Sequence, residues 1–226
     1  MSRAIRNKIF WIIIALLIFG FLIFNYFYSK NQEEKRIQET LEKLTEAVNL
    51  MESIKEEMPT ELLEVHQFLI NQIKGKEFKL YQIRPELKGK LIMYHGVKSK
   101  GIFVDPSVNL RTEMWIPIFY HEAGHLYWHS KYPVETFEEF QKQLYASEEH
   151  SHIVEAQAWN IVKEYFPVKE GVNQQELKLF NIYERETLLY NKMIKGDSGA
   201  EIEWKKVIEN NIKVQEQQQE FLKKSF

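Results

Sequence analysis

Apolar residues are spread unevenly along this chain, and the longest apolar run lies near the N-terminus. From Ile9 to Tyr28 the sequence reads IFWIIIALLIFGFLIFNYFY, without a charged residue. Twenty helical residues span about 30 Å, the thickness of a bilayer's hydrocarbon core. Trp11 and Tyr26 lie toward opposite ends of the run, where aromatic rings settle at membrane interfaces. The pattern predicts a membrane anchor within residues 1–30.

The residues around this run favour an uncleaved anchor over a signal peptide that is removed. The run is longer than the roughly 7 to 15 residues of a signal-peptide core, and no small-x-small cleavage site follows it. Basic residues are balanced on its two sides, and the N-terminal amine adds positive charge to the first side. We therefore expect a single-pass protein of the cell membrane, with its main domain outside the cytoplasm.

The next segment, residues 31–58, is highly charged and has a helical apolar pattern. Its apolar residues recur at alternating intervals of four and three, at Ile37, Leu41, Leu44, Val48 and Met51. This spacing is that of a coiled-coil seam, although it covers barely more than two heptads. Two interpretations remain open. Residues 31–57 form a stalk that joins two copies in a homodimer, or the helix packs its apolar stripe on its own domain.

Residues 59–170 are expected to form the main domain, which begins with a helix and a small sheet. Residues 77–105 contain three short apolar runs separated by turn residues. This pattern predicts a small sheet that is antiparallel or mixed, and mostly antiparallel. The run Ile102–Val104 is expected to be either an edge strand that binds an extended peptide or a strand inside the sheet.

The remainder of the chain has the pattern of helices. They are expected at about 110–130, 137–145, 148–166, 174–195 and 199–223. Capping boxes at Thr136 with Glu139 and at Ser198 with Glu201 mark two of the starts. Residues 171–226 are rich in Gln, Glu and Lys and are interpreted as a solvated C-terminal helical pair. The predicted fold class is α+β, mostly helical overall.

The helix expected at 110–130 carries the sequence HEAGH at residues 121–125. Residues four apart share one face of a helix, so His121 and His125 can bind one tetrahedral zinc ion. Glu122 is turned by about 100° from His121, beside the metal, where it can accept a proton from a zinc-bound water. Gly124 leaves a smooth flank for the close approach of another backbone, such as that of the sheet.

A catalytic zinc ion needs a third protein ligand, and the helix expected at 148–166 offers several candidates. Glu155 is the residue predicted for this role. Glu148 and His152 lie on the same face, seven and three residues earlier, and both are competitors. If Glu155 binds the metal, His152 is expected to orient a ligand or to stabilise the oxyanion of the reaction. The oxyanion role is equally open to Tyr94, His95, Tyr127, Tyr145 and Tyr183.

The segment from Gly101 to Pro167 resembles the zincin metallopeptidases whose third ligand is a glutamate, and most of all the ImmA/IrrE-type group. The resemblance rests on GIFVDP before the helix that carries HEAGHLYWH, and on Glu155-Ala156 in the later helix. It implies a zincin-like domain with His121 and His125 as ligands, Glu122 as general base and Glu155 as third ligand. It also implies a sheet whose edge strand lines the cleft.

These observations predict a membrane-anchored zinc metalloendopeptidase that hydrolyses a protein or peptide substrate. The formal net charge of −2 and the lack of a dense basic cluster argue against a nucleic-acid partner. The chain has no cysteine, which excludes thiolate metal ligands and disulfides. Two alternatives remain: a noncatalytic partner-binding module stabilised by zinc, and a cytoplasm-facing protease that cleaves a repressor or a membrane-associated factor.

Overall fold

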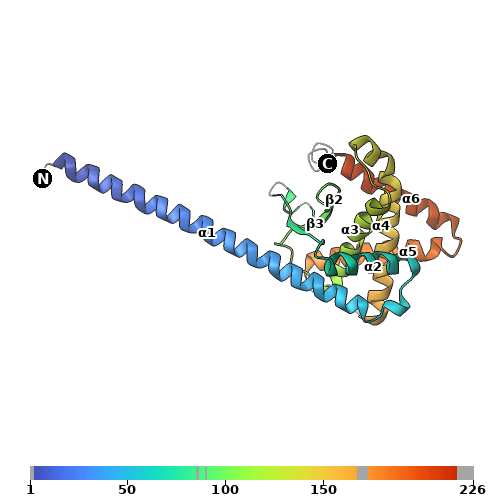
Figure 1. Ribbon diagram of the computed structural model, residues 1–226. Helices are drawn as coiled ribbons and strands as arrows, with labels where there is room; N and C mark the ends of the chain where they lie inside the picture. The colour runs from blue at the N-terminus through green and yellow to red at the C-terminus, as the bar shows by residue number, and fades with distance from the viewer. Residues whose placement is uncertain (1–2, 85–86, 90, 167–172, 218–226) are drawn as a thin grey trace. The chain divides into compact units, whose positions relative to one another are not determined.

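The computed structural model describes the backbone of residues 3–84, 87–89, 91–166 and 173–217 (Figure 1). Within these ranges, the side chains of residues 3–20, 22, 23 and 215–217 are not described. The chain divides into two compact units, Met1–Thr40 and Leu41–Phe226. The end of the predicted C-terminal helix, beyond Gln217, lies outside the described residues.

Helix α1 (Arg3–Glu52) begins in the first unit and continues into the second. Exposed i,i+4 pairs such as Lys30–Glu34 lie along it. Among the described residues, no helix combines the length and apolar character needed to cross a membrane. Most side chains of the predicted anchor, Ile9–Tyr28, lie outside the described residues, so the anchor stays a prediction.

Within the second unit, the end of α1 packs into a large apolar core. Leu44, Val48 and Met51 are at most 3% exposed and belong to this core. The C-terminal part of the predicted seam therefore packs on its own domain, as one of the two interpretations expects. The homodimer stays a prediction. A short 3-10 helix (Lys55–Glu57) and helix α2 (Thr60–Lys74) follow.

The sheet of the second unit has three short strands in the order β1-β3-β2. They are β1 (Leu80–Gln82), β2 (Met93–Gly96) and β3 (Gly101–Val104). Strand β3 pairs parallel with β1 and antiparallel with β2, so the sheet is mixed, which is one of the two predicted forms. The reason is that the chain crosses over after β1 and places the β2–β3 hairpin with β3 in the centre. The Ile102–Val104 run is therefore internal, and β2 is an edge strand.

Four long helices complete the second unit (Figure 1). They are α3 (Thr112–Lys131), α4 (Phe137–Tyr165), α5 (Gln174–Met193) and α6 (Ser198–Gln217). Helix α4 is continuous, so the predicted division into two helices is wrong. Ala146 and Ser147 contain no helix breaker, and the polar residues Ser147 and Glu148 turn toward the interior instead of marking a loop.

The sequence predicts that the C-terminal helices form a solvated pair, but in the structure these helices pack into the fold. Tyr183 of α5 and Trp204 and Ile208 of α6 are almost fully buried. The capping box at Thr136 is confirmed. At the start of α6, however, the side chain of Asp197 accepts hydrogen bonds from the backbone N–H groups of Gly199 and Ala200. Asp197 therefore has the capping role predicted for Ser198.

Helices α3 and α4 lie side by side (Figure 1), and Gly124 of α3 is in close contact with α4. A Cβ atom on Gly124 would lie 3.1 Å from both the Cα and the Oγ atoms of Ser151 in α4. The predicted smooth flank is confirmed, but the neighbouring backbone belongs to α4 and not to the sheet. This contact fixes the distance between the two helices that carry the predicted ligands.

We expect Gly124→Ala to destabilise the protein. The same change in an open helix stabilises by about 1 kcal/mol, whereas overpacking here should destabilise by about 1–3 kcal/mol. Thermal unfolding would measure the effect. In a Ser151→Gly background the loss of stability caused by Gly124→Ala should be smaller, because the Oγ and Cβ atoms of Ser151 are absent. An equal rise in melting temperature in both backgrounds would contradict the close packing.

Candidate metal centre

The two histidines of the HEAGH sequence point one nitrogen each at the same place. His121 and His125 lie one turn apart on α3, and their Nε2 atoms are 3.2 Å apart. His125 is 1% exposed. Two imidazole nitrogens at this distance, on a buried helix face, have the arrangement that a shared metal ion requires.

Glu148 of α4 supplies a third ligand atom at the same place. Its Oε1 atom lies 3.2 Å from Nε2 of His125, and its Oε2 atom lies 3.9 Å from Nε2 of His121. The carboxylate is 1% exposed. A buried carboxylate is unfavourable without a positive charge nearby, and a metal ion between these three side chains would provide it. These residues could therefore hold a metal ion.

The other nitrogen of each histidine has a partner of its own. Nδ1 of His121 lies 2.8 Å from Oε2 of Glu155, and Nδ1 of His125 lies 2.7 Å from Oγ of Ser147. Because a carboxylate only accepts hydrogen bonds when it is ionised, Nδ1 of His121 donates to Glu155. In the neutral ring the Nε2 atom then has the lone pair that a metal ion needs. Such partners orient the rings of metal-binding histidines.

The predicted third ligand, Glu155, therefore lies on the side of His121 that faces away from the paired Nε2 atoms. Its competitor Glu148 lies beside those atoms. The geometry favours Glu148 as the ligand and Glu155 as the residue that positions His121. Direct metal binding by Glu155 stays a prediction.

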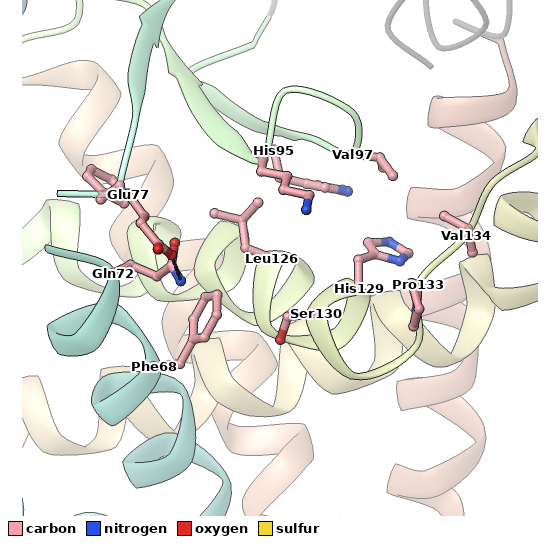
Figure 2. Close-up of a pocket in the computed structure, with 12 residues that line it drawn as sticks. Phe68, Gln72, Glu77, His95, Val97, Leu126, His129, Ser130, Pro133 and Val134 are labelled. Atoms are coloured by element: carbon pink, nitrogen blue, oxygen red, sulfur yellow. Dashed lines mark hydrogen bonds between the residues drawn. The ribbon is translucent and has the colours of Figure 1, made fainter. Parts of the chain in front are cut away.

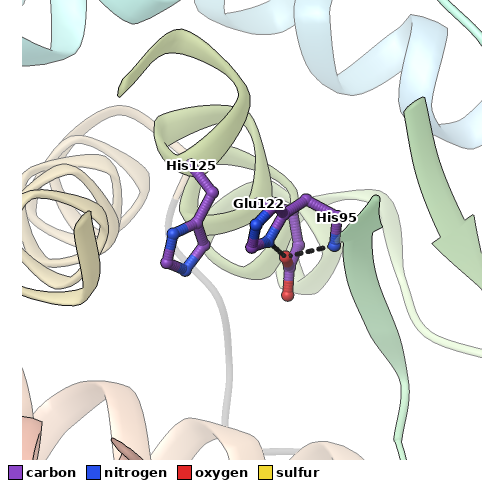
Figure 3. A group of neighbouring side chains, drawn as sticks. All are labelled: His95, Glu122 and His125. Atoms are coloured by element: carbon purple, nitrogen blue, oxygen red, sulfur yellow. Dashed lines mark hydrogen bonds and ion pairs between the residues drawn. The ribbon is translucent and has the colours of Figure 1, made fainter. Parts of the chain in front are cut away.

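Glu122, the predicted general base, is held by strand β2 (Figure 3). The backbone N–H of His95 donates to Oε2 of Glu122 at 2.8 Å, and Nδ1 of His95 lies 3.4 Å from the same oxygen. The His95 ring also stacks on the His125 ring, with centroids 4.2 Å apart. The three side chains form one group whose ligand atoms lie within 4.8 Å of one another. Glu122 is therefore close to the paired histidines and fixed in orientation.

Burial and neighbouring charges set the protonation of these groups in the absence of a metal ion. Burial raises the pKa of Glu122 and lowers the pKa of His125 to about 4. Burial would also lower the pKa of His121, but the carboxylates of Glu155, Glu122 and Glu148 together outweigh it and raise the pKa to about 10. Burial would raise the pKa of Glu148, yet His125 and His121 hold it well below its usual range. The buried carboxylates thus favour a positive charge at this site.

His152 lies on α4 close to the carboxylates of both Glu148 and Glu155. It is 5% exposed, and its Nδ1 atom lies 3.4 Å from Oε2 of Glu155 and 3.3 Å from Oε2 of Glu186. Its ring packs edge-to-face on the His121 ring, 4.6 Å away. His152 also belongs to a group with His121 and Glu148 that could hold a metal ion, so its predicted role in orienting a ligand stays a prediction. His152, Glu155 and Glu186 together form a further group that could hold a metal ion.

Sequence reasoning missed Glu186, and it named His95 only as one of several side chains eligible to stabilise the oxyanion. Glu186 lies between Tyr183 and Tyr190 on the buried face of α5, and this helical spacing was a usable signal for a buried carboxylate. His95 had no such signal, because its role depends on the position of β2 next to α3.

We expect the two glutamates of α4 to differ in their effect on metal affinity. Glu148→Ala should abolish stoichiometric zinc binding, because it removes a ligand. Glu155→Gln should weaken binding by roughly 10- to 100-fold, as loss of a positioning partner does. Titration with zinc against a competing chelator would measure both, with exposed Glu138→Ala on the same helix as control. A larger loss in Glu155→Gln than in Glu148→Ala would reverse the assignment.

Comparisons with known proteins do not add to this geometry. No family model matches the sequence, and neither a curated protein nor a solved structure matches it. The chemical interpretation of the site therefore rests on its own side chains.

Proposed function

We propose that this protein is a zinc-dependent peptidase of the zincin type. The observation that carries the proposal is the convergence of the Nε2 atoms of His121 and His125 with the carboxylate of Glu148. Two imidazoles and one carboxylate are a ligand set of catalytic zinc, which leaves one coordination position for water. The chain offers no thiolate, since it contains no cysteine.

When bound, a zinc ion acts as a Lewis acid that activates a water molecule and polarises a peptide carbonyl. Glu122 then acts as general base. The hydrogen bond from His95 fixes its Oε2 atom, and we assign proton transfer to Oε1. Glu122 takes a proton from the attacking water and delivers it to the nitrogen of the leaving amine. The products are a carboxylic acid and an amine.

Strand β2 provides a place for the substrate backbone. It pairs only with β3 among the described strands. On its outer edge the backbone N–H of His95 donates to Glu122, so an extended peptide would pair with the remaining backbone groups of that edge. Adding a strand to a sheet edge is a common mode of peptide recognition. His95 lies in β2 and contacts Glu122, so a peptide on this edge would pass close to the general base.

A noncatalytic zinc module is the alternative from another class. Such a module would need His121, His125 and Glu148 but not Glu122. Glu122 is a buried carboxylate that accepts a hydrogen bond from a backbone N–H, and burying a carboxylate is unfavourable. A noncatalytic module would have no need of this carboxylate. This observation favours the peptidase over the module.

We further propose that residues 1–30 anchor the protein in the cell membrane, with the peptidase domain outside the cytoplasm. The uncharged run Ile9–Tyr28 supports this location. Toward its end five aromatic side chains are exposed by 58–66%, those of Phe21, Phe24, Tyr26, Phe27 and Tyr28. Substrates are then proteins or peptides near the membrane surface.

We expect Glu122→Gln to abolish peptide hydrolysis and to keep stoichiometric zinc. The amide can no longer accept the proton, and a fall of at least about 100-fold is typical for loss of a general base. Cleavage of a peptide library by full-length protein in detergent, together with zinc content, would measure this. Glu138→Gln on the surface of α4 is the control. Hydrolysis that persists in Glu122→Gln, or zinc binding without hydrolysis in the wild type, would contradict the proposal.

We expect the full chain to resist extraction from membranes by alkaline carbonate. A chain that begins at Lys30 should be found in the soluble fraction, because the apolar run is gone. A C-terminal reporter active only outside the cytoplasm would establish the side on which the domain lies. Complete release of the full chain by carbonate would contradict the anchor, and a reporter active in the cytoplasm would reverse the topology.

A further inference from the structure

A cavity of about 310 Å³ lies next to the metal centre, between β2 and the end of α3 (Figure 2). Helix α2 contributes Phe68 and Gln72, and α3 contributes Leu126 and His129. The loops after β2 and α3 close the remaining sides. The volume lies at the lower end of the range for small-ligand sites. It is suited to one side chain and not to a whole peptide.

His95 connects this cavity with the catalytic residues. Its backbone N–H holds Glu122, its ring stacks on His125, and the same ring points into the cavity in Figure 2. The side chain is 10% exposed, and its Nε2 atom is buried without a hydrogen-bond partner among the described residues. Burial of a polar atom in this way is unfavourable unless the atom forms a hydrogen bond with a ligand or a water molecule.

The walls of the cavity are mostly apolar and aromatic. The apolar side chains are Phe68, Phe78, Val97, Leu126, Pro133 and Val134. The rings of His95 and His129 stack on each other, with centroids 5.6 Å apart. Two charged residues of opposite sign, Glu77 and Lys100, also line it. With these charges balanced, the cavity is suited to a large uncharged side chain.

We propose that this cavity binds an aromatic side chain of the substrate, at a position next to the peptide bond that is cleaved. This inference rests on the proposed function. A peptide that extends along the outer edge of β2, beside the hydrogen bond from His95 to Glu122, passes His95 and projects alternate side chains toward the same face. A phenylalanine or tyrosine ring would pack on the aromatic walls, and a tyrosine hydroxyl could also meet Nε2 of His95.

Val97 offers a way to fill the cavity without touching the metal centre. It lies on the loop after β2, and Val97→Trp would place a ring where the substrate ring binds. Lys98→Trp is the matched control. It introduces the same side chain one residue later on this loop, at an exposed position that does not line the cavity.

The first experiment is cleavage of a degenerate peptide library by the full-length protein. We expect phenylalanine and tyrosine to be preferred over glycine and aspartate by at least about tenfold at one position beside the cleaved bond, as side-chain pockets allow. Val97→Trp should remove this preference, and Lys98→Trp should keep it. Cleavage without aromatic preference, or a preference unchanged in Val97→Trp, would overturn the inference while the proposed function stands.

The second experiment does not depend on catalysis. Saturation-transfer NMR would follow binding of N-acetyl-phenylalaninamide and N-acetyl-glycinamide to the Glu122→Gln protein. Binding of the phenylalanine compound alone, lost in Val97→Trp and kept in Lys98→Trp, would support the cavity even if no form of the protein cleaves peptides. Equal signals from both compounds, or binding insensitive to Val97→Trp, would overturn it.

Discussion

The close contact between Gly124 of α3 and Ser151 of α4 is the constraint on which the site depends. Because Gly124 has no side chain, α4 can approach α3 closely here and bring the carboxylate of Glu148 to within 3.2 Å of His125. The same packing brings Glu155 to the other nitrogen of His121. A wider spacing would separate both carboxylates from the histidines. One glycine thus links the packing of the domain to the geometry of its candidate metal centre.

The site is built in layers around the two histidines. Glu148 lies beside the Nε2 atoms, Ser147 and Glu155 hold the Nδ1 atoms, and His152 lies behind both glutamates. Glu186 of α5 closes the far side of His152. The C-terminal helices therefore support the centre directly. Buried charges of this density are unfavourable in an ordinary core, which is the physical reason to assign a metal ion to the site.

Strand β2 connects this centre with the surface that we assign to the substrate. It is an edge strand of the sheet, and its backbone donates the hydrogen bond to Glu122. It also forms one wall of the cavity beside α3. His95 takes part in all three. A peptide bound on this edge would therefore meet the general base and the side-chain cavity together.

The sequence predicted those parts of the site that depend on local geometry. His121, Glu122 and His125 lie on one short stretch of helix, and their spacing alone places both histidines on one face. The third ligand could not be chosen in this way. Glu148 and Glu155 are seven residues apart and share a face, so only the position of α4 along α3 distinguishes them.

The same limit applies to the sheet and to its edge. Lengths and turn residues predicted a small sheet, but the parallel pairing of β1 with β3 is a contact between distant segments. That pairing makes β2 the edge strand and gives His95 its role. The continuity of α4 was missed because buried polar residues at Ser147 and Glu148 resemble a loop in sequence. They are polar because they belong to the site.

The most direct test of the central claim is a crystal structure of the zinc-loaded protein with anomalous data collected at the zinc edge. The account predicts one strong peak bonded to Nε2 of His121, Nε2 of His125 and the carboxylate of Glu148, with Glu155 still on Nδ1 of His121. A peak bonded to Glu155 in place of Glu148 would overturn the ligand assignment. The lack of any peak between the two histidines would contradict the metal centre itself.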